Sequence, residues 1–191
     1  AGDSVVELSG QGSDTVRSLV SVNFSTQHIE RIELIGNAAI NASANALANT
    51  LIGNGANNTL NAGSGNDSLS GGAGNDVLIG GAGTDQLEGG AGADLFTFTV
   101  VSDSAVGTSR DVIKDFLRGT DKVDLSSIDA NTALDGNQAF NFIEASAFSD
   151  VAGQLRFTQG ILQGDVNGDG VADFEVRLLG LTTLASSDCS L

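Results

Sequence analysis

The sequence lacks several residue types that compact globular domains commonly use. It contains no proline, methionine, tryptophan or tyrosine, and its aromatic residues are 9 phenylalanines. So few large apolar side chains favour the thin core of a solenoid over a thick globular core. The length of 191 residues is enough for one or two domains.

Cysteine and histidine each occur once, which excludes several kinds of site. Cys189 cannot form an intramolecular disulfide, so it is either an inert buried thiol or a thiol that pairs with another molecule. His28 alone cannot anchor a zinc site or a conventional catalytic triad, and a surface or packing role is expected. If such a chain is extracellular, metal ions must brace it in place of disulfides.

Basic residues are also scarce. The chain has 8 Lys and Arg against 24 Asp and Glu, which gives a formal net charge of -16. This balance argues against nucleic acid and anionic membranes as partners and favours bound cations. The sequence has no apolar run that could span a membrane and no visible signal peptide. Because the sequence pattern is already under way at Ala1, we expect this chain to be a piece of a longer protein.

A nine-residue repeat occupies residues 63 to 98. Each copy reads Gly-Gly-x-Gly-x-Asp-x-apolar-x, except that Ala62 replaces the first glycine of the first copy. This nonapeptide is typical of calcium-binding β-helix repeats. The predicted metal-site residues within it are Asp67, Asp76, Asp85, Asp94, Gly63, Gly65, Gly72, Gly74, Gly81, Gly83, Gly90 and Gly92.

The repeat has a direct physical interpretation. Its glycine-rich first six residues predict a tight turn, and its last three predict a short strand with one inward apolar side chain. If two repeats form one coil, Asp67 lies beside Asp85 and Asp76 beside Asp94. Paired carboxylates among turn carbonyls form the all-oxygen site that Ca²⁺ prefers. A flexible linker has no reason to keep an apolar residue in every copy, and no dinucleotide or P-loop motif is present.

Degenerate copies of the repeat extend upstream, through residues 36 to 61. Asn49 and Asn58 take the aspartate position there. An amide has a carbonyl oxygen but no charge, so these loops are predicted either to bind calcium weakly or to serve only as coil; Asn58 is retained as a candidate ligand. We interpret this segment as an extension of the solenoid.

Residues 1–35 are predicted to form strands that cap the solenoid. An isolated copy of the repeat at 9–17 makes Asp14 a candidate ligand, with Asp3 and Glu7 placed either to share its cation or to lie in a solvated turn. Strands are predicted at 20–24 and 29–35, with a turn at 25–27 between them.

Downstream of the repeats, residues 96 and 98 are predicted to end the regular coil. Asp103 follows Asp94 by nine residues and is predicted to complete a site opposite Asp85. Four basic residues spaced by four follow, but the glycine and aspartates among them favour a strand–turn–strand with local ion pairs and a solvated face: Arg110, Lys114, Arg118 and Lys122.

The C-terminal segment is predicted to form antiparallel strands at 140–143, 154–158, 161–163 and 174–179. Between the last two lies a second cation motif, with Gly170 at its sixth position and Val176 where an EF-hand has its bidentate glutamate. The alternatives are a calcium loop between strands and a metal-free Asx-rich hairpin turn. Its candidate ligands are Asp165, Asn167, Asp169 and Asp173.

These motifs carry a resemblance to known families. The repeats resemble those of the RTX calcium-binding β-roll proteins, and the tail is similar to the C-terminal domain of serralysin-type secreted metalloproteases at 111–116, 119–126 and 164–174. Together the two resemblances cover roughly residues 9–18 and 45–191. They imply an all-β, right-handed parallel β-roll that holds several Ca²⁺ ions between stacked loops.

The resemblance also implies secretion from a Gram-negative bacterium by a type I apparatus that reads an uncleaved C-terminal signal. Asp188 and Leu191 fit the usual acidic and apolar ending, whereas Cys189 and Ser190 do not. The zinc motif His-Glu-x-x-His of the proteases is absent, so nothing of their catalytic domain is carried over and no enzyme activity is expected.

The sequence thus predicts three segments: an N-terminal strand cap continuous with the roll at 1–44, the RTX roll at 45–100, and an antiparallel β cap with the export signal at 101–191. The predicted function is a module that folds on calcium outside the cell. Its predicted partners are the type I secretion apparatus and the catalytic or adhesive domain of a parent protein. The alternative is a calcium-braced module that binds a polysaccharide or a cell surface. Carboxylate-based enzyme chemistry is disfavoured because every prominent aspartate already belongs to a calcium frame.

Overall fold

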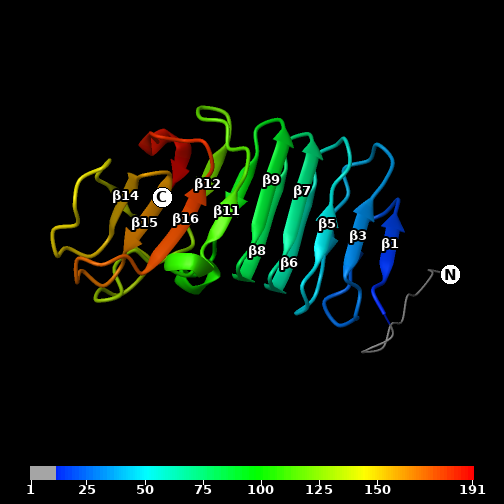
Figure 1. Ribbon diagram of the computed structural model, residues 1–191, viewed down its shortest axis with the longest axis horizontal. Coiled ribbons are helices and arrows are strands. Elements are labelled where there is room, and N and C mark those ends of the chain that lie inside the picture. Colours follow the sequence, from blue (N-terminus) through cyan, green and yellow to red (C-terminus); the bar gives the residue numbers. More distant parts are fainter. Residues whose placement is uncertain (1–11) are drawn as a thin grey trace.

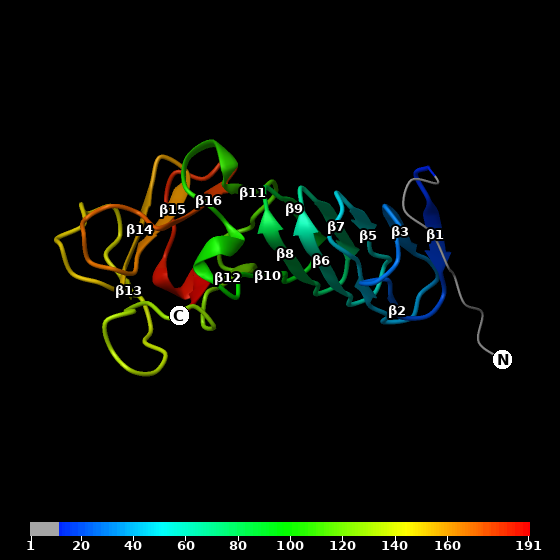
Figure 2. The same cartoon turned by 90° about the horizontal axis from the view of Figure 1, so that it is seen from below.

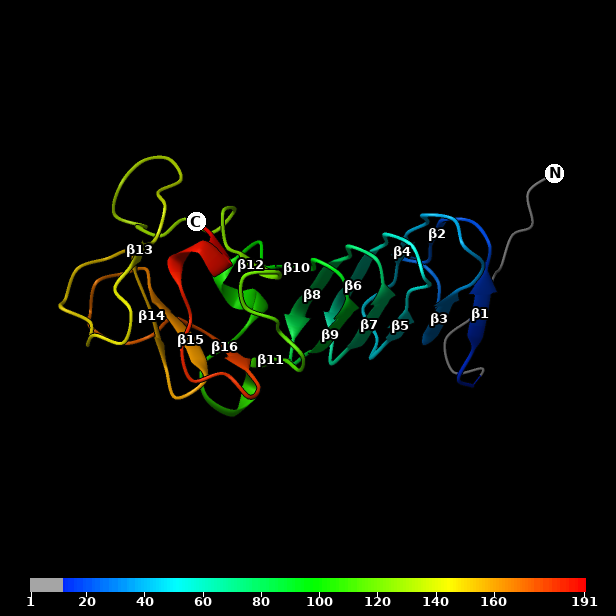
Figure 3. The same ribbon diagram turned by 90° about the horizontal axis from the view of Figure 1, so that it is seen from above.

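The structure is a computed structural model that describes residues 12–191. It is an elongated all-β solenoid built from two stacked sheets (Figures 1, 2 and 3). In sheet A the strands follow the order β1 (Thr15–Ser18), β3 (Arg31–Leu34), β5 (Thr50–Ile52), β7 (Ser68–Ala73), β9 (Gln86–Ala91), β11 (Asp111–Ile113), β16 (Phe174–Leu178), β15 (Ile161–Asp165), β14 (Gln154–Thr158) and β13 (Asn141–Phe142).

Sheet B lies behind sheet A in Figure 1, and as far as β12 its strands alternate with those of sheet A along the chain. Its order is β17 (Cys189–Ser190), β12 (Lys122–Asp124), β10 (Leu95–Thr97), β8 (Val77–Gly83), β6 (Thr59–Gly65), β4 (Ala42–Ser43) and β2 (Val22–Asn23). Three short 3₁₀ turns complete the elements: η1 (Val101–Asp103), η2 (Gly107–Ser109) and η3 (Ser186–Asp188).

The nine-residue period explains this alternation. Successive repeats enter opposite sheets, so β6 pairs with β8 and β7 with β9, both parallel and in register at the apolar position. Each apolar side chain points between the sheets, and two facing ladders of buried residues form the core of the repeats: Leu51, Leu69 and Leu87 from sheet A, and Leu60, Leu78 and Phe96 from sheet B. The predicted parallel β-roll with two repeats per coil is therefore confirmed. The strands also extend into the glycine turns, where Gly63 pairs with Gly81.

The N-terminal strands are coils of the same roll. β1 pairs with β3 and β3 with β5, and β2 pairs with β4, all parallel. The turn predicted at 25–27 is present, but the predicted strand at 20–24 shrinks to β2 because Val20 points into solvent. Asp3, Glu7 and the first residues of the isolated repeat lie outside the described residues.

The roll also continues beyond Phe98, where the sequence predicted its end. β11 pairs with β9, and β12 pairs with β10, so one further coil forms after the intervening loop at 98–110. β11 and β12 confirm the strand–turn–strand predicted for this region. Phe98 meets Phe174 edge to face, with ring centroids 5.3 Å apart, and this contact joins the roll core to the C-terminal strands.

The C-terminal strands are antiparallel only in part. β14, β15 and β16 form the predicted antiparallel sheet, but β13 pairs parallel with β14, and β16 joins the roll by pairing parallel with β11. β17 pairs parallel with β12 and extends sheet B. Both sheets therefore cross residue 100 without a break. No helix in residues 12–191 is long and apolar enough to cross a membrane.

Candidate metal centre

Aspartates and asparagines form one column at the entry edge of each sheet. The members of column A (Asn49, Asp67, Asp85, Asp111) lie directly before strands of sheet A or, for Asp111, at the first strand residue, and column B (Asn58, Asp76, Asp94, Asp121) precedes strands of sheet B. Within each column, the backbone N–H of one member donates to Oδ1 of the next, over 2.7–3.0 Å. The predicted neighbours Asp67–Asp85 and Asp76–Asp94 are thus adjacent in the structure.

The second carboxylate oxygen has no partner in five of these residues. Oδ2 is buried and without a hydrogen bond in Asp67, Asp76, Asp85, Asp94 and Asp111. Burial of a carboxylate oxygen without a hydrogen bond destabilises the folded state, so each of these oxygens needs a bound proton or a cation to offset this cost.

Burial accordingly raises the pKa of these carboxyls. The pKa rises to about 7 for Asp67, about 6 for Asp76 and Asp85, and about 8 for Asp111, and it also rises for Asp94. Desolvation is the largest cause, the hydrogen bond from the preceding member opposes it, and repulsion from neighbouring aspartates adds to it.

The glycines of the repeats keep backbone carbonyls close to these oxygens. All eight predicted glycines have positive φ. A Cβ on Gly81 would collide with the carbonyl oxygen of Gly63 in the neighbouring coil, and a Cβ on Gly80 would collide with Oδ2 of Asp85. Only glycine allows this approach of oxygen atoms.

The chemistry of this donor set fits a hard divalent cation. It consists of oxygen atoms alone, both carboxylate and backbone carbonyl, which Ca²⁺ prefers. The described residues contain no group of three or more His, Cys, Asp or Glu side chains that could hold a metal ion. Carboxylates alone are therefore too few at any one place, and the turn carbonyls would have to supply the remaining ligands.

Asn49 and Asn58 differ from the aspartates that follow them in the two columns. The side-chain Oδ1 of Asn58 accepts from the Asn54 N–H at 2.8 Å, and its Nδ2 donates to the Ile40 carbonyl at 2.6 Å. Asn49 likewise donates to the Ile29 carbonyl. Both polar atoms of Asn58 are already used within the protein. Because the Asn58 oxygen has a second lone pair, both predictions for this segment, weak calcium binding and purely structural coil, stay open.

Asp103 does not take the column position opposite Asp85, and metal binding by Asp103 stays a prediction. Its Oδ2 accepts hydrogen bonds from the Thr99 backbone and hydroxyl and from the Val100 N–H. Asp111 stands opposite Asp85 instead. Asp103 still lies close enough to raise the pKa of both carboxyls.

Sequence reasoning therefore missed Asp111 and Asp121 as column members. Asp121 follows Asp94 by 27 residues, which is three periods of nine, and this spacing was a usable signal. Asp111 follows Asp85 by 26 residues, one short of three periods, so counting nines does not find it. In Asp121 the second oxygen is satisfied, since Oδ2 accepts from the Leu117 N–H.

Asp14 lies one coil before Glu30. The Asp14 N–H donates to Oε2 of Glu30 at 2.9 Å, as the aspartates do within the columns. Glu30 thus takes a column-like place that sequence reasoning did not assign. Metal binding by Asp14 stays a prediction.

The predicted C-terminal loop lies between β15 and β16, as expected. Its carboxylates accept hydrogen bonds from the loop backbone: Asp165 from Gly168 and Gly170, and Asp173 from Val166. Asn167 donates to Asp173 and accepts from Asp169. These bonds build the Asx-rich turn by themselves, and calcium binding by this loop stays a prediction.

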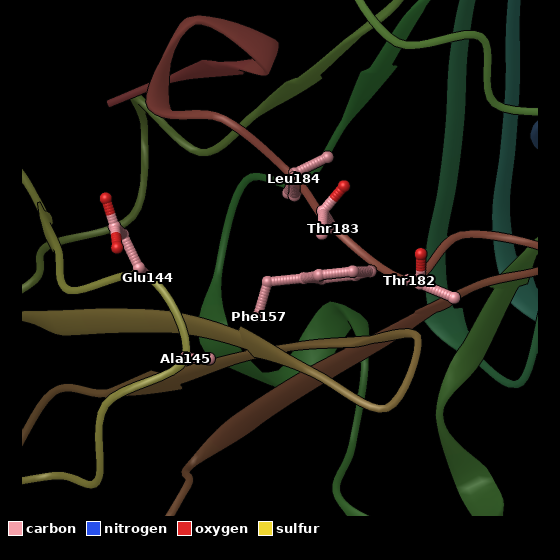
Figure 4. A pocket seen from close by; sticks show the side chains of 6 residues that line it. All are labelled: Glu144, Ala145, Phe157, Thr182, Thr183 and Leu184. Carbon is pink, nitrogen blue, oxygen red and sulfur yellow. The ribbon is translucent and has the colours of Figure 1, made fainter.

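A cavity of about 210 Å³ opens in the C-terminal part, between β14 and the segment after β16 (Figure 4). None of the predicted metal ligands lines it. Its walls are Glu144, Ala145, Phe157, Thr182, Thr183 and Leu184.

The comparisons with known proteins agree with this architecture. A family model described as the C-terminal region of the M10 peptidase serralysin matches residues 2–190. The chain belongs to this family. The serralysin C-terminal resemblance stated from the sequence is thus confirmed, and it supports a calcium-binding β-roll module.

One solved structure is similar over almost the whole chain. It is the solution structure of the AlgE6R3 subunit from the Azotobacter vinelandii mannuronan C5-epimerase, with 26% sequence identity and a TM-score of 0.50. The match covers 99% of this serralysin C-terminal chain and 85% of the subunit. No curated protein matches the sequence.

Proposed function

We propose that this chain is a calcium-triggered folding module of a larger exoprotein. The observation that carries the proposal is the set of five buried carboxylate oxygens without partners. Asp67, Asp85 and Asp111 would hold calcium at column A, and Asp76 and Asp94 at column B, together with carbonyls of the glycine turns. Calcium would supply positive charge where the fold otherwise leaves negative charge buried.

The energetics favour a switch. Glycine-rich repeats give the unfolded chain a large conformational entropy, and the stacked carboxylates repel one another without a cation. A site at tenfold its dissociation constant adds about 1.4 kcal/mol, so several sites exceed the stability of a small domain. Because neighbouring coils share each turn, binding at one site favours the next.

The difference in calcium concentration between the cytosol and the outside of the cell would determine where the chain folds. Extracellular sites of the weak class have dissociation constants of about 10⁻⁴–10⁻³ M, so they stay empty in the cytosol. The chain would then remain unfolded and exportable by a type I apparatus and would fold outside. In this role it is a non-catalytic part of its parent, and Asp188 to Leu191 would belong to the export signal.

The test is far-UV circular dichroism of the chelator-treated chain, titrated with Ca²⁺ and separately with Mg²⁺. We expect a steep, Ca²⁺-specific change from coil to β signal, with a midpoint far above cytosolic calcium. A chain that is fully folded in chelator and indifferent to calcium would refute the switch.

A second candidate function is binding of a polysaccharide. It is favoured by the similar subunit, whose parent enzyme is a mannuronan C5-epimerase. This function is compatible with the first, because calcium would build the surface that binds.

A further inference from the structure

The outer face of sheet A collects most of the basic residues of a very acidic chain. Of the 8 Lys and Arg residues, the following lie on strands of this sheet or directly beside β11: Arg17, Arg31, Arg110, Lys114, Arg156 and Arg177. We call these six residues the basic face. Figure 1 looks onto this sheet.

Strand register shows that these side chains point away from the core. Arg31 stands beside Ile32 and Arg177 between Val176 and Leu178, and these apolar neighbours are buried between the sheets. Lys114 and Arg177 are both exposed. Within residues 12–191, neither forms an ion pair.

A continuous cross-strand row connects two arginines of the basic face. Arg31 begins it and Arg177 ends it, and the side chains between them are neutral: Thr50, Ser68, Gln86 and Val112. Five strand spacings separate the two arginines, about 24 Å. The row therefore has an arginine at each end, of which Arg31 is paired with Glu33, and three hydrogen-bonding side chains between them.

Acidic side chains on the same face are fewer and mostly neutralised. Glu33 is bridged by Arg17 and Arg31 at 3.0 and 2.8 Å, and Glu175 by Arg110 at 2.7 Å. Glu88 on β9 has no ion pair among the described residues, and Asp165 ends β15 as a buried carboxylate. Asp115 directly follows Lys114 and accepts hydrogen bonds from the Gly89 and Gly90 N–H groups. On the outer side of sheet B, by contrast, Lys122 is the one basic residue among the described strands.

The ligand that fits this face is long, thin and negatively charged. Hydroxyl and amide side chains between basic groups suit the hydroxyls and carboxylates of an acidic sugar chain. Nucleic-acid binding without sequence preference uses aromatic side chains as stacking platforms. The row from Arg31 to Arg177 contains none.

Calcium is expected to control this face. Column A lies at the edge of the same sheet, and its unpartnered carboxylates add negative charge beside the basic face. Each bound Ca²⁺ adds two positive charges there, which favours approach of a polyanion. We propose that the calcium-loaded chain binds a linear acidic polysaccharide across the outer face of sheet A. The calcium dependence rests on the proposed function; the location of the face does not.

The test uses the full chain in saturating calcium and an oligomannuronate too short to gel. The double variant Lys114→Gln/Arg177→Gln removes two exposed charges that form no ion pair among the described residues, and we expect binding to weaken about tenfold. Lys122→Gln is the matched control on sheet B and should change affinity less than twofold. Glu88→Gln should bind more tightly, which a loss of folding cannot mimic. Added salt should weaken binding.

The outcomes separate the two proposals. Equal losses in the double variant and in Lys122→Gln, or equal binding of a neutral oligoglucoside or a single-stranded DNA, would overturn the polysaccharide face. A calcium-induced β signal without oligomannuronate binding would overturn it and leave the folding switch standing. Binding through Lys114 and Arg177 that is the same in chelator would uphold the face and overturn its calcium control.

Discussion

At the residue scale, Asp85 offers a direct test of what satisfies the columns. Its Oδ1 accepts the Asp67 N–H, while its buried Oδ2 has no partner. Asp85→Asn keeps an acceptor and removes the charge. Because folding raises the pKa of Asp85 to about 6, the metal-free variant should gain roughly 2–3 kcal/mol at pH 8. In calcium the variant should instead be less stable than the parent chain. Urea unfolding in chelator and in calcium measures both effects.

The control for this substitution is Asp135→Asn, which makes the same charge change in an exposed loop outside the columns. It should leave stability unchanged within about 0.5 kcal/mol under both conditions. If both variants behaved alike, the carboxylate of Asp85 would have no special role.

Gly81 tests the close approach of the coils. Its φ is +86°, and an added Cβ would meet the Gly63 backbone, including its carbonyl carbon at 2.9 Å. Gly81→Ala should therefore destabilise the calcium-loaded roll by about 2 kcal/mol or more and raise the calcium midpoint. Gly55→Ala has open space for a Cβ and no positive φ, so its calcium titration should match the parent. Equal midpoints for the two variants would contradict the packing argument.

How far the sequence predicted each ligand depended on the regularity of the repeat. Asp67, Asp76, Asp85 and Asp94 were predicted because a fixed period of nine determines which carboxylates stack. Asp111 was missed because its spacing from Asp85 departs from that period by one residue. The hydrogen bonds of both polar atoms of Asn58 were also not predicted, because they depend on the path of the preceding coil.

At the scale of elements, the degenerate coils at 36–61 have asparagines at the positions where later coils have aspartates. The amide groups of these asparagines form hydrogen bonds within the protein, whereas the Oδ2 atoms of the aspartates have no partner. Asn58→Asp would remove the donor to the Ile40 carbonyl and place a new carboxylate beside Asp76. We expect the metal-free chain to lose about 2 kcal/mol, with most of the loss recovered in calcium. Thermal unfolding in chelator and in calcium measures the difference.

The matched control for this change is Asn57→Asp. Asn57 is exposed, and its Oδ1 accepts the Asn75 N–H, a bond that an aspartate preserves. Its stability should stay within about 0.5 kcal/mol of the parent. A loss of the same size in both variants would mean that added charge alone, not the missing amide donor, destabilises the coil.

The elements that the sequence did not predict are those that depart from the period. The loop at 98–110 separates β10 from β11, and Asp111 at the start of β11 falls one residue short of the period, so β11 cannot be found by counting nines, whereas Asp121 before β12 keeps the period. Likewise β13 pairs parallel with β14 although antiparallel strands follow, because pairing direction depends on the path of the connecting loop. In contrast, the buried apolar residues of the two core ladders could be predicted wherever glycine turns fix the length of each coil.

At the scale of the whole molecule, protons and calcium compete for the same buried oxygens. The folded carboxyls have raised pKa values, from about 6 for Asp76 and Asp85 to about 7 for Asp67 and about 8 for Asp111. A raised folded pKa contributes stability that is fully present below the unfolded value of 3.8 and is lost as the pH rises through the folded pKa. The metal-free roll should therefore be more stable at pH 5 than at pH 8.

Calcium reverses this dependence, because binding requires the carboxylates in their ionised form and releases their protons. We expect the calcium midpoint of folding to rise as the pH falls from 8 to 6, and the chain in chelator to gain β signal over the same range. Circular dichroism titrations at several pH values measure both, and Asp85→Asn should show a weaker pH dependence than Asp135→Asn. A calcium midpoint independent of pH, with a metal-free chain equally unfolded at pH 5 and pH 8, would show that these buried oxygens do not hold the cation.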